Sequence, residues 1–254
     1  MYRAKLLNVI VNDRGRFMIS SLALYLHFRS QRDAATTLTA GRLRTLSVQL
    51  GLCSSGRAAA MIALMRWGGY LAPVAAAAGE RSQRLMVTGR LIAHLIERWR
   101  MQLTIMVPLF PEAQVALDRL EDPDFVAAFG LAQSQQFVSG FRFVDHTPEL
   151  AVFFDRNAGL MVLLTLAAMG SGDDRLMPEA AQVSISALAR RFGVSRPHVI
   201  ALLRDAEAQG LLRRSGEEVR IGDVLDRALE HFFALLFLVN LAAVRTALAD
   251  TNSA

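Results

Sequence analysis

The stretch from residue 183 to residue 221 constrains the fold more than any other part of this sequence. It predicts a short helix that Ser186 caps and that buries an apolar side containing Leu188 and Ala189. We expect Gly193 to end this helix, because glycine adopts the left-handed conformation at little cost. The chain would then turn sharply into a second helix.

The second helix carries the stronger pattern. Ser195 is placed to cap it, and Pro197 lies in its first turn, where a missing N–H group is harmless. Gly210 would stop the helix, and residues 211–221 then predict a two-stranded hairpin with Ser215-Gly216 at its tip. The apolar residues that recur at helical spacing and predict one buried side are Val199, Leu202, Leu203 and Ala206.

This order of helix, glycine turn, capped helix, glycine and hairpin resembles the winged helix-turn-helix domains of bacterial regulators of the MarR and GntR types. The residues that stand at the spacing of these families are Leu188-Ala189, Gly193-Val194-Ser195, Leu202-Leu203 and Gly210-Leu211-Leu212. The resemblance implies that the second helix enters the DNA major groove and that the hairpin is the wing. Some winged helices bind only other proteins, so this alternative stays open.

A second copy of the pattern lies nearer the N-terminus. A shift of 142 residues aligns Gly51 with Gly193, and a shift of 141 aligns Gly69 with Gly210, so both helix-ending glycines recur. The difference of one residue predicts an insertion in the first copy's turn, at 53–56. We therefore expect an internal repeat of helix, helix pair and hairpin.

These features predict a mainly α protein with small β-hairpin wings. Tandem winged helix-turn-helix domains would be related by pseudo-twofold symmetry and joined by a helical scaffold. The expected parts are an N-terminal winged-helix domain (1–105), a helical connector (106–155) and a C-terminal winged-helix domain with a long apolar terminal helix (156–254). Within the connector, the alternation of Phe141-Arg142-Phe143-Val144 suggests a short strand.

Composition adds weaker constraints. The formal net charge is +5 and Lys5 is the only lysine, so arginine, which suits phosphates and guanine edges, carries the positive charge. The single cysteine, Cys53, cannot form an internal disulfide, which agrees with a cytoplasmic location. The apolar runs 158–169 and 232–244 are shorter than the ~20 residues of a membrane-spanning helix. We therefore expect both to be buried helices, with no membrane partner.

A DNA reader needs side chains that reach base edges and others that bind phosphates. We expect recognition helices 54–67 and 195–208 in the major groove, and wings 70–87 and 211–221 on the backbone or in the minor groove. Arg196 is the best candidate for a guanine contact, with a phosphate clamp as the alternative. The candidate DNA-binding residues are Ser54, Ser55, Arg57, Arg66, Arg81, Arg84, Ser195, Arg196, Pro197, His198, Arg204, Arg213, Arg214 and Arg220.

The first copy has fewer polar side chains that could contact base edges than the second. Ala58-Ala59-Ala60 removes most donors and acceptors from its recognition helix, which leaves open whether this copy reads sequence. Its hairpin ends in residues 81–88, which resemble the MarR wing, and the resemblance makes Arg81 and Arg84 candidates for the minor groove.

The sequence contains no convincing catalytic motif. His94 with Glu97, and Asp145-His146 with Glu149, come nearest to metal-ligand spacing, but zinc sites need three or four converging ligands. The turn Gly170-Ser171-Gly172 lacks the lysine of a phosphate loop. We therefore expect no enzyme, no metal site and no cofactor.

The interpretation that follows is a transcriptional regulator that binds double-stranded DNA, acting as a repressor. It would be a monomer with an internal pseudo-dimer or a homodimer through its apolar helices, and the resemblance leaves room for a small-molecule effector. Two alternatives are a plasmid replication initiator with two winged helices and a protein-interaction scaffold of tandem winged helices. The arginine surplus argues against the scaffold.

Overall fold

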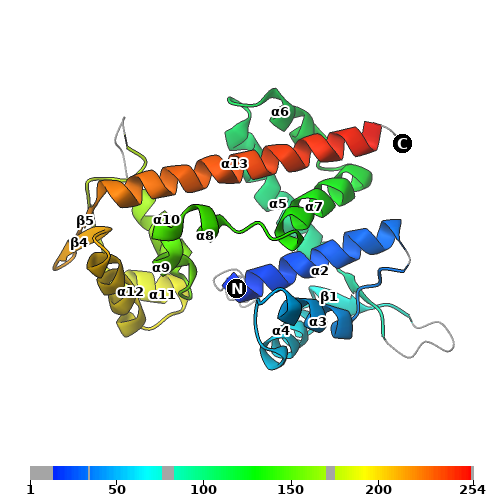
Figure 1. Cartoon of the computed structure of the whole chain (residues 1–254), viewed down its shortest axis with the longest axis horizontal. Helices are drawn as coiled ribbons and strands as arrows, with labels where there is room; N and C mark the ends of the chain where they lie inside the picture. The colour runs from blue at the N-terminus through cyan, green and yellow to red at the C-terminus, as the bar shows by residue number, and fades with distance from the viewer. Residues whose placement is uncertain (1–13, 34, 76–82, 170–174, 253–254) are drawn as a thin grey trace. The chain divides into compact units, whose positions relative to one another are not determined.

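A computed structural model describes residues 14–33, 35–75, 83–169 and 175–252. The chain is mainly helical, with small antiparallel sheets (Figure 1). The elements are α2 (Arg14–Arg32), α3 (Ala40–Gln49), α4 (Ser55–Trp67), β1 (Leu71–Pro73), β2 (Leu85–Val87), α5 (Gly89–Met106), α6 (Pro111–Asp118), α7 (Pro123–Val138), α8 (Phe143–His146), η1 (Pro148–Leu150), α9 (Ala151–Phe154), α10 (Gly159–Ala167), β3 (Ala180–Gln182), α11 (Ile185–Phe192), α12 (Arg196–Ala208), β4 (Leu212–Ser215), β5 (Glu218–Ile221) and α13 (Asp223–Asn252).

The backbone divides into two compact units. What we call the N-terminal unit contains residues 18–141 together with 237–252, and the C-terminal unit contains residues 142–236 together with 14–17. Each unit holds a pair of short helices followed by a hairpin, α3–α4 with β1–β2 in the first and α11–α12 with β4–β5 in the second.

In the N-terminal unit, α2 lies alongside the helix pair α3–α4 (Figure 1). The buried hydroxyl of Ser20 on α2 lies 3.9 Å from the sulfur of Met65 on α4. Strands β1 and β2 pair antiparallel with Leu71 opposite Val87, and an isolated bridge joins Thr39 to Arg84. Backbone pairing therefore joins the two strands of the hairpin and also connects the hairpin to the start of α3.

Helices α5 and α7 form the aromatic core of the N-terminal unit. The Trp99 ring lies 4.6 Å from that of Phe129, centroid to centroid, and both side chains are buried. A buried indole needs a hydrogen-bond acceptor, and Trp99 Nε1 donates to Gln133 Oε1 at 2.6 Å. Gln133 in turn donates to the buried Asn240 of α13, so this polar side chain of an apolar helix is satisfied.

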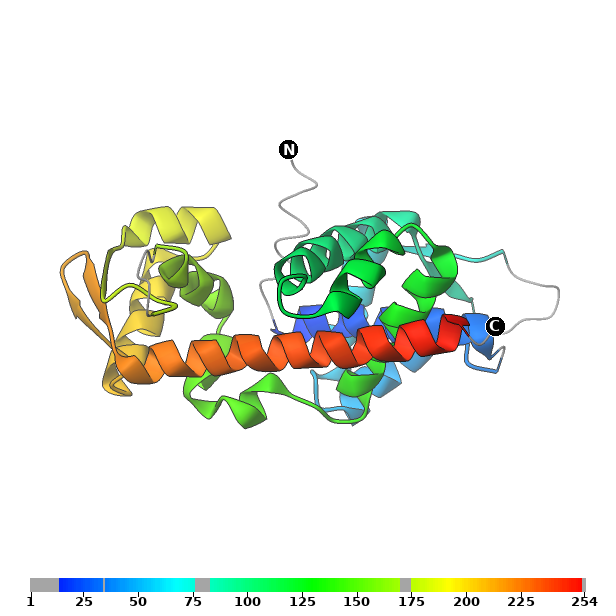
Figure 2. The same ribbon diagram turned by 90° about the horizontal axis from the view of Figure 1, so that it is seen from above.

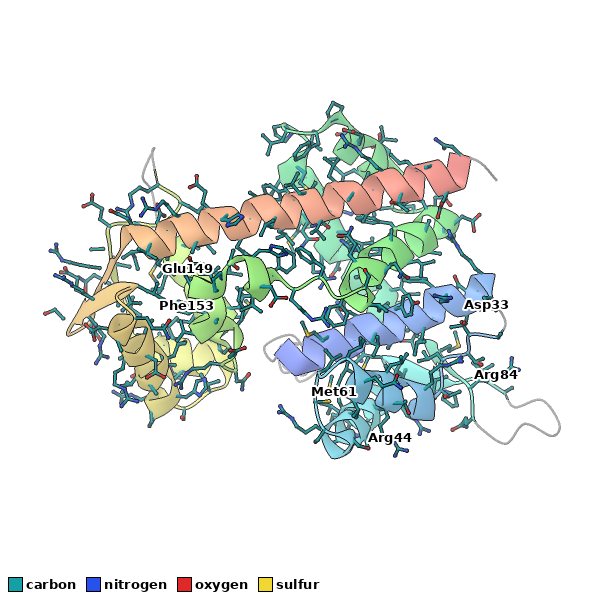
Figure 3. The ribbon with its side chains drawn as sticks, viewed as in Figure 1. Asp33, Arg44, Met61, Arg84, Glu149 and Phe153 are labelled. Carbon is teal, nitrogen blue, oxygen red and sulfur yellow. The ribbon has the colours of Figure 1, made fainter. Side chains whose placement is uncertain are left out.

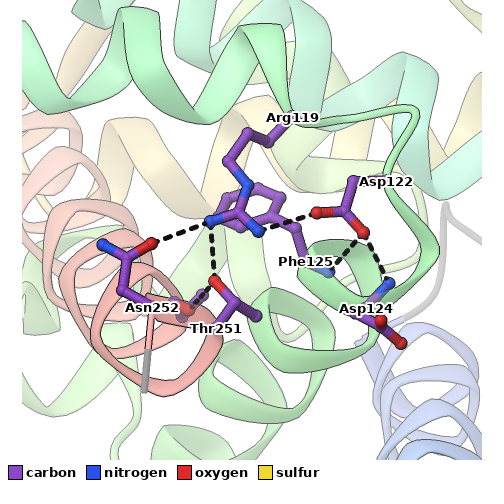
Figure 4. Close-up of polar contacts among 7 residues, drawn as sticks. Arg119, Asp122, Asp124, Phe125, Thr251 and Asn252 are labelled. Atoms are coloured by element: carbon purple, nitrogen blue, oxygen red, sulfur yellow. Dashed lines mark hydrogen bonds and ion pairs between the residues drawn. The ribbon is translucent and has the colours of Figure 1, made fainter. Parts of the chain in front are cut away.

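The end of α13 is fixed to the corner between α6 and α7. Arg119 donates to Thr251 Oγ1 at 2.7 Å, pairs with Asp122 at 2.7 Å and covers the ring of Phe125 (Figure 4). Asp122 also accepts the N–H of Asp124 at 3.0 Å and so caps α7. One arginine thus joins two segments that are far apart in the sequence.

The C-terminal unit has its own apolar core. Its sheet has the strand order β3-β5-β4, with Ala181 opposite Val219 and Leu212 opposite Ile221. Side chains from α10, α11, α12 and the first turns of α13 pack with the inward residues of this sheet. Fully buried members include Leu163, Leu166, Leu202, Leu203 and Leu229.

Helix α13 is a single uninterrupted helix that contributes to both cores (Figure 2). Over its most apolar window the mean hydropathy is 2.0 and 33% of the window is buried. By length and composition α13 is apolar enough to cross a membrane, and the bent pair Pro148–Phe154 and Gly159–Ala167 also qualifies if it is counted as one span. The length argument made for run 232–244 does not hold, because α13 continues beyond the run on both sides. Residues of the run range from buried, as at Leu241, to exposed, as at Leu238.

The predicted strand at 141–144 is wrong as well. Phe143–His146 is the short helix α8, and Thr147 ends it by donating its N–H and its hydroxyl to the carbonyl of Phe143. The half-buried Phe143 ring packs edge-on against Phe232 at 5.2 Å in this helical conformation. An alternation of four residues without a neighbouring strand is too short to outweigh that packing.

Candidate nucleic-acid interface

The cap of helix α11 lies two residues earlier than predicted. The cap is Ser184, whose side chain accepts the N–H of Ala187, and Ser186 lies inside the helix. The prediction that Ser186 caps the helix was therefore wrong. Gly193 ends the helix at φ +67°, the left-handed conformation that the pattern predicted.

Helix α12 is built as the sequence pattern predicted. Ser195 caps it by accepting the N–H of His198 at 3.2 Å, and Pro197 lies in its first turn. The four predicted inward residues are all fully buried, and the opposite side exposes Arg196, Ile200 and Arg204. Burial of one side therefore leaves the opposite side of α12 open to a ligand.

The hairpin after α12 has a different tip from the one predicted. Ser215 pairs with Glu218, so the turn residues are Gly216-Glu217 and not Ser215-Gly216. Gly216 has φ +64°, which moves the turn one residue later than the sequence suggested.

The exposed side of the hairpin concentrates positive charge. Arg213 lies directly opposite Arg220, and both side chains are exposed. Like charges in facing positions destabilise a strand pair unless a counter-charge is present. Glu218 supplies part of that counter-charge through an ion pair with Arg220 at 2.7 Å.

A turn between α9 and α10 holds α12 through two polar contacts. His198 Nε2 lies 2.7 Å from the carbonyl oxygen of Asn157, and Arg156 forms an ion pair with Asp205. His198 is therefore half-buried, with one ring nitrogen already bonded within the unit. This contact makes His198 a positioning residue for α12, in addition to its predicted place on the interface.

The same turn depends on Gly159. A Cβ atom at this position would lie 2.1 Å from the carbonyl oxygen of Phe153, a buried residue of α9 (Figure 3). Real Cβ atoms do not come that close to backbone, so only glycine fits here without moving α9 or α10.

Two arginines of this unit lie close to acidic side chains. Arg204 approaches Asp205 at 3.5 Å, while the backbone N–H of Arg214 donates to Glu207 at 2.9 Å. For Arg196 and Arg213, no ion pair exists with any other residue that the structure describes. These two guanidinium groups face water and are available to an anionic partner.

The first helix pair shares local features with the second. Gly51 has φ +65° between α3 and α4, and Ser54 caps α4 by accepting the N–H of Arg57. Ser54, Ser55, Arg57 and Arg66 are all exposed. The predicted insertion at 53–56 therefore lies in the turn and the start of α4, where it leaves the cap intact.

The outward side of α4 is small and apolar. Ala59, Ala60 and Ala63 are exposed, and Trp67 at the end of the helix is 80% exposed. Arg84 lies exposed just before β2 (Figure 3). Arg81, predicted for the tip of the same hairpin, lies outside the described residues.

Sequence reasoning missed two features of the interface. The third strand, β3, carries Ala180, Ala181 and Gln182, residues with little intrinsic strand preference, so only pairing with β5 makes it a strand. The contacts of Arg156 and Asn157 with α12 join residues that are 41 or more positions apart in the sequence. No local sequence pattern predicts such contacts.

The weaker metal candidates do not gather further ligands. His94 Nδ1 lies 3.6 Å from Glu97 on α5, and the half-buried His94 ring also lies against the ring of Tyr70. Among the residues that the structure describes, no group of three or more histidine, cysteine, aspartate or glutamate side chains is placed to hold a metal.

Each unit therefore has a candidate interface of its own, made of a helix pair with an outward helix face and an adjoining hairpin. The first presents alanines, and the second presents arginines and Ile200. No protein-family model, no curated protein and no solved structure matches this chain.

Proposed function

We propose that this protein is a cytoplasmic transcriptional repressor that binds double-stranded DNA in a sequence-specific manner. Each helix pair with its hairpin would be a winged helix-turn-helix. In the C-terminal unit, α12 would enter the major groove and the hairpin β4–β5 would contact the backbone or the minor groove.

The observation that carries this proposal is the outward side of α12. Arg196 lies at the exposed start of the helix, Ile200 is 37% exposed one turn later, and Arg204 follows after another turn. A guanidinium group donates two hydrogen bonds to a guanine edge, and an exposed aliphatic side chain fits a thymine methyl. The combination provides what direct base reading needs on one helix face.

The hairpin supports the same assignment. Arg213 and Arg220 face each other on the exposed side, a placement that costs stability in the free protein. A phosphate between them would remove that cost. Their exposure on an antiparallel hairpin next to α12 is therefore expected of a phosphate-binding wing.

The test begins with selection of a preferred duplex from a pool of random-sequence duplexes. Binding of the labelled preferred duplex and of a scrambled duplex is then followed by fluorescence anisotropy over a salt series. We expect selective binding whose affinity falls steeply with salt. Equal, weak binding to both duplexes would overturn the proposal in favour of a protein-interaction scaffold.

Arg196→Ala provides the residue-level test. We expect it to cost about 1–3 kcal/mol on the preferred duplex and little on the scrambled one, because a base contact carries the sequence information. Arg227→Ala is the matched control, since Arg227 is an exposed arginine of α13 that lies outside the proposed interface. Equal losses on both duplexes would make Arg196 a phosphate clamp.

A further inference from the structure

The N-terminal unit has a surface pocket between its two short helices. It has a volume of about 240 Å³ and is lined by Ala40, Gly41 and Arg44 of α3 and by Ala59, Ile62, Ala63 and Arg66 of α4. The alanines and the glycine form a floor without polar side chains. The charged groups at the pocket are the two arginines, and Figure 3 shows Arg44 on the side of the helix pair away from α2.

The chain around this pocket contains no acidic residue. From residue 35 to residue 79 the charged residues are Arg42, Arg44, Arg57 and Arg66. Arg42 uses its guanidinium group on the carbonyls of Ala35 and Thr37, at 3.1 and 3.4 Å. Arg44 and Arg66 make no ion pair with the residues that the structure describes, so both can bind an anion that enters the pocket.

The backbone adds to this preference. Ala40 and Gly41 are the first residues of α3, whose cap Thr39 accepts the N–H of Arg42. N–H groups in the first turn of a helix carry the positive end of its dipole. The pocket thus combines the start of α3 with two guanidinium groups.

The corresponding place in the C-terminal unit is built differently. Ile200 and Arg204 stand where the first pair has Ala59 and Ala63, and Glu207 stands where it has Arg66. Glu207 is already bonded to the N–H of Arg214. The arginine-lined pocket is therefore a property of the N-terminal unit and does not follow from the shared backbone.

We propose that this pocket binds a phosphate group between Arg44 and Arg66, and that the group is a backbone phosphate of duplex DNA. The identification of the phosphate as part of duplex DNA rests on the proposed function. Binding of a free phosphate in the same pocket would not depend on that function. The first helix pair would then bind DNA without reading its sequence, because phosphate contacts carry no direct sequence information.

The charge test uses Arg44→Gln with Arg66→Gln in the full chain. We expect affinity to fall about tenfold, equally for the preferred and the scrambled duplex, and the salt slope to fall by about one to two. Arg100→Gln removes a charge from an exposed site on α5 of the same unit and should change neither. If the double variant matches the wild-type protein on both duplexes, the phosphate pocket is refuted.

The shape test leaves the charge unchanged. Ala63→Leu fills the pocket from an exposed position on α4, so the helix pair should still fold. We expect the same uniform loss of affinity as in the double arginine variant. Ala93→Leu adds the same side chain to an exposed position of α5, outside the pocket lining and outside the helix pair, and is the control. Equal binding by the two leucine variants would contradict a role for the pocket.

An internal probe separates DNA from free phosphate. The chain has two tryptophans, and Trp67 is 80% exposed next to Arg66, while Trp99 is buried. Iodide quenching therefore reports on Trp67. Protection by duplex DNA at concentrations where inorganic phosphate has no effect supports the DNA phosphate, and the double arginine variant should lose that protection.

The outcomes distinguish the two proposals. Protection by inorganic phosphate in a protein that binds no duplex would refute the proposed function and the DNA phosphate, leaving a site for free phosphate. Selective duplex binding that the double arginine variant retains unchanged would refute the pocket and keep the proposed function.

Discussion

Helices α4 and α12 bury corresponding residues but expose different ones. The buried residues are Ala58, Met61, Ile62 and Met65 in α4, and Val199, Leu202, Leu203 and Ala206 in α12. On the outward side, α4 has Ala59 and Ala63 where α12 has Ile200 and Arg204. Both helices therefore bury one apolar side at helical spacing, while their different outward residues can bind different ligands.

The helices also differ in how they are held. Helix α12 is bonded through His198 and Asp205 to the turn between α9 and α10. Such contacts fix the direction of a helix that must place donors against base edges. A helix that binds only phosphates through flanking arginines needs less exact placement. The comparison therefore predicts that substitutions in the C-terminal unit change the selectivity of DNA binding more than substitutions in the N-terminal unit do.

The largest expected effect comes from Gly159→Ala. The new Cβ would meet the backbone of Phe153, and relief requires α9 or α10 to move, so we expect the C-terminal unit to lose about 3 kcal/mol of stability. Hydrogen exchange measured by mass spectrometry should show faster exchange across α12. The signal of Trp99, which belongs to the N-terminal unit, should change less.

Gly56→Ala is the matched change in the other unit. Gly56 lies within α4, and nothing lies within 4 Å of a Cβ placed there. Alanine should stabilise this helix by up to about 1 kcal/mol. If both glycine variants shift stability equally, the special demand at Gly159 is disproved.

A smaller effect is expected from Arg156→Gln. Its ion pair with Asp205 is about one-third exposed on both sides, so we expect a loss of about 0.5–1 kcal/mol in stability. Selectivity for the preferred duplex should fall further than binding to the scrambled duplex, because α12 would be less well placed. Anisotropy on both duplexes measures the ratio.

Arg245→Gln serves as its counterpart, since it breaks an exposed pair with Glu112 at 2.7 Å in the N-terminal unit. That variant should leave the ratio of the two affinities unchanged. A change in the ratio as large as that of Arg156→Gln would mean that any lost ion pair perturbs selectivity.

The smallest expected effect is acid sensitivity in the N-terminal unit. The hydrogen bond from Arg119 lowers the pKa of Asp122, and bonds from its own backbone N–H and from Arg245 lower the pKa of Glu112. Because these pKa values are lower in the folded state, their stabilisation is present above the ordinary carboxyl pKa of about 4 and is lost as pH falls through the folded values.

Urea unfolding between pH 6 and pH 2.5, followed by Trp99 fluorescence, measures this loss. Asp122→Asn should flatten the pH dependence, since the amide cannot ionise. A variant whose stability falls with acid as steeply as the wild-type protein would show that Asp122 contributes nothing to it.

Local patterns in the sequence predicted the elements that local forces decide. The glycine at 193, the cap at Ser195 and the buried stripe of α12 each follow from conformational preference or helical spacing. The cap of α11 was misplaced by two residues because both Ser184 and Ser186 are suitable caps. Patterns of this kind also predicted the internal repeat, which stays a prediction.

Features that depend on distant partners were not predictable. Strand β3 forms only against β5, α8 is decided by packing of Phe143 on Phe232, and the Arg156 contact with Asp205 requires the folded unit. The pocket of Arg44 and Arg66 is another case, since the two arginines lie on different helices. Each arises from side chains that meet only after the chain has folded.

Helix α13 also has a consequence for the order of folding during synthesis. A ribosome makes a chain from its N-terminus, and domains formed early usually fold first. Here the N-terminal unit needs Leu241, Val244 and Ala247, which are buried within it but are translated after all of residues 142–236. The unit that contains most of the early residues is therefore completed last, and its apolar core stays incomplete until after residues 142–236 have been made.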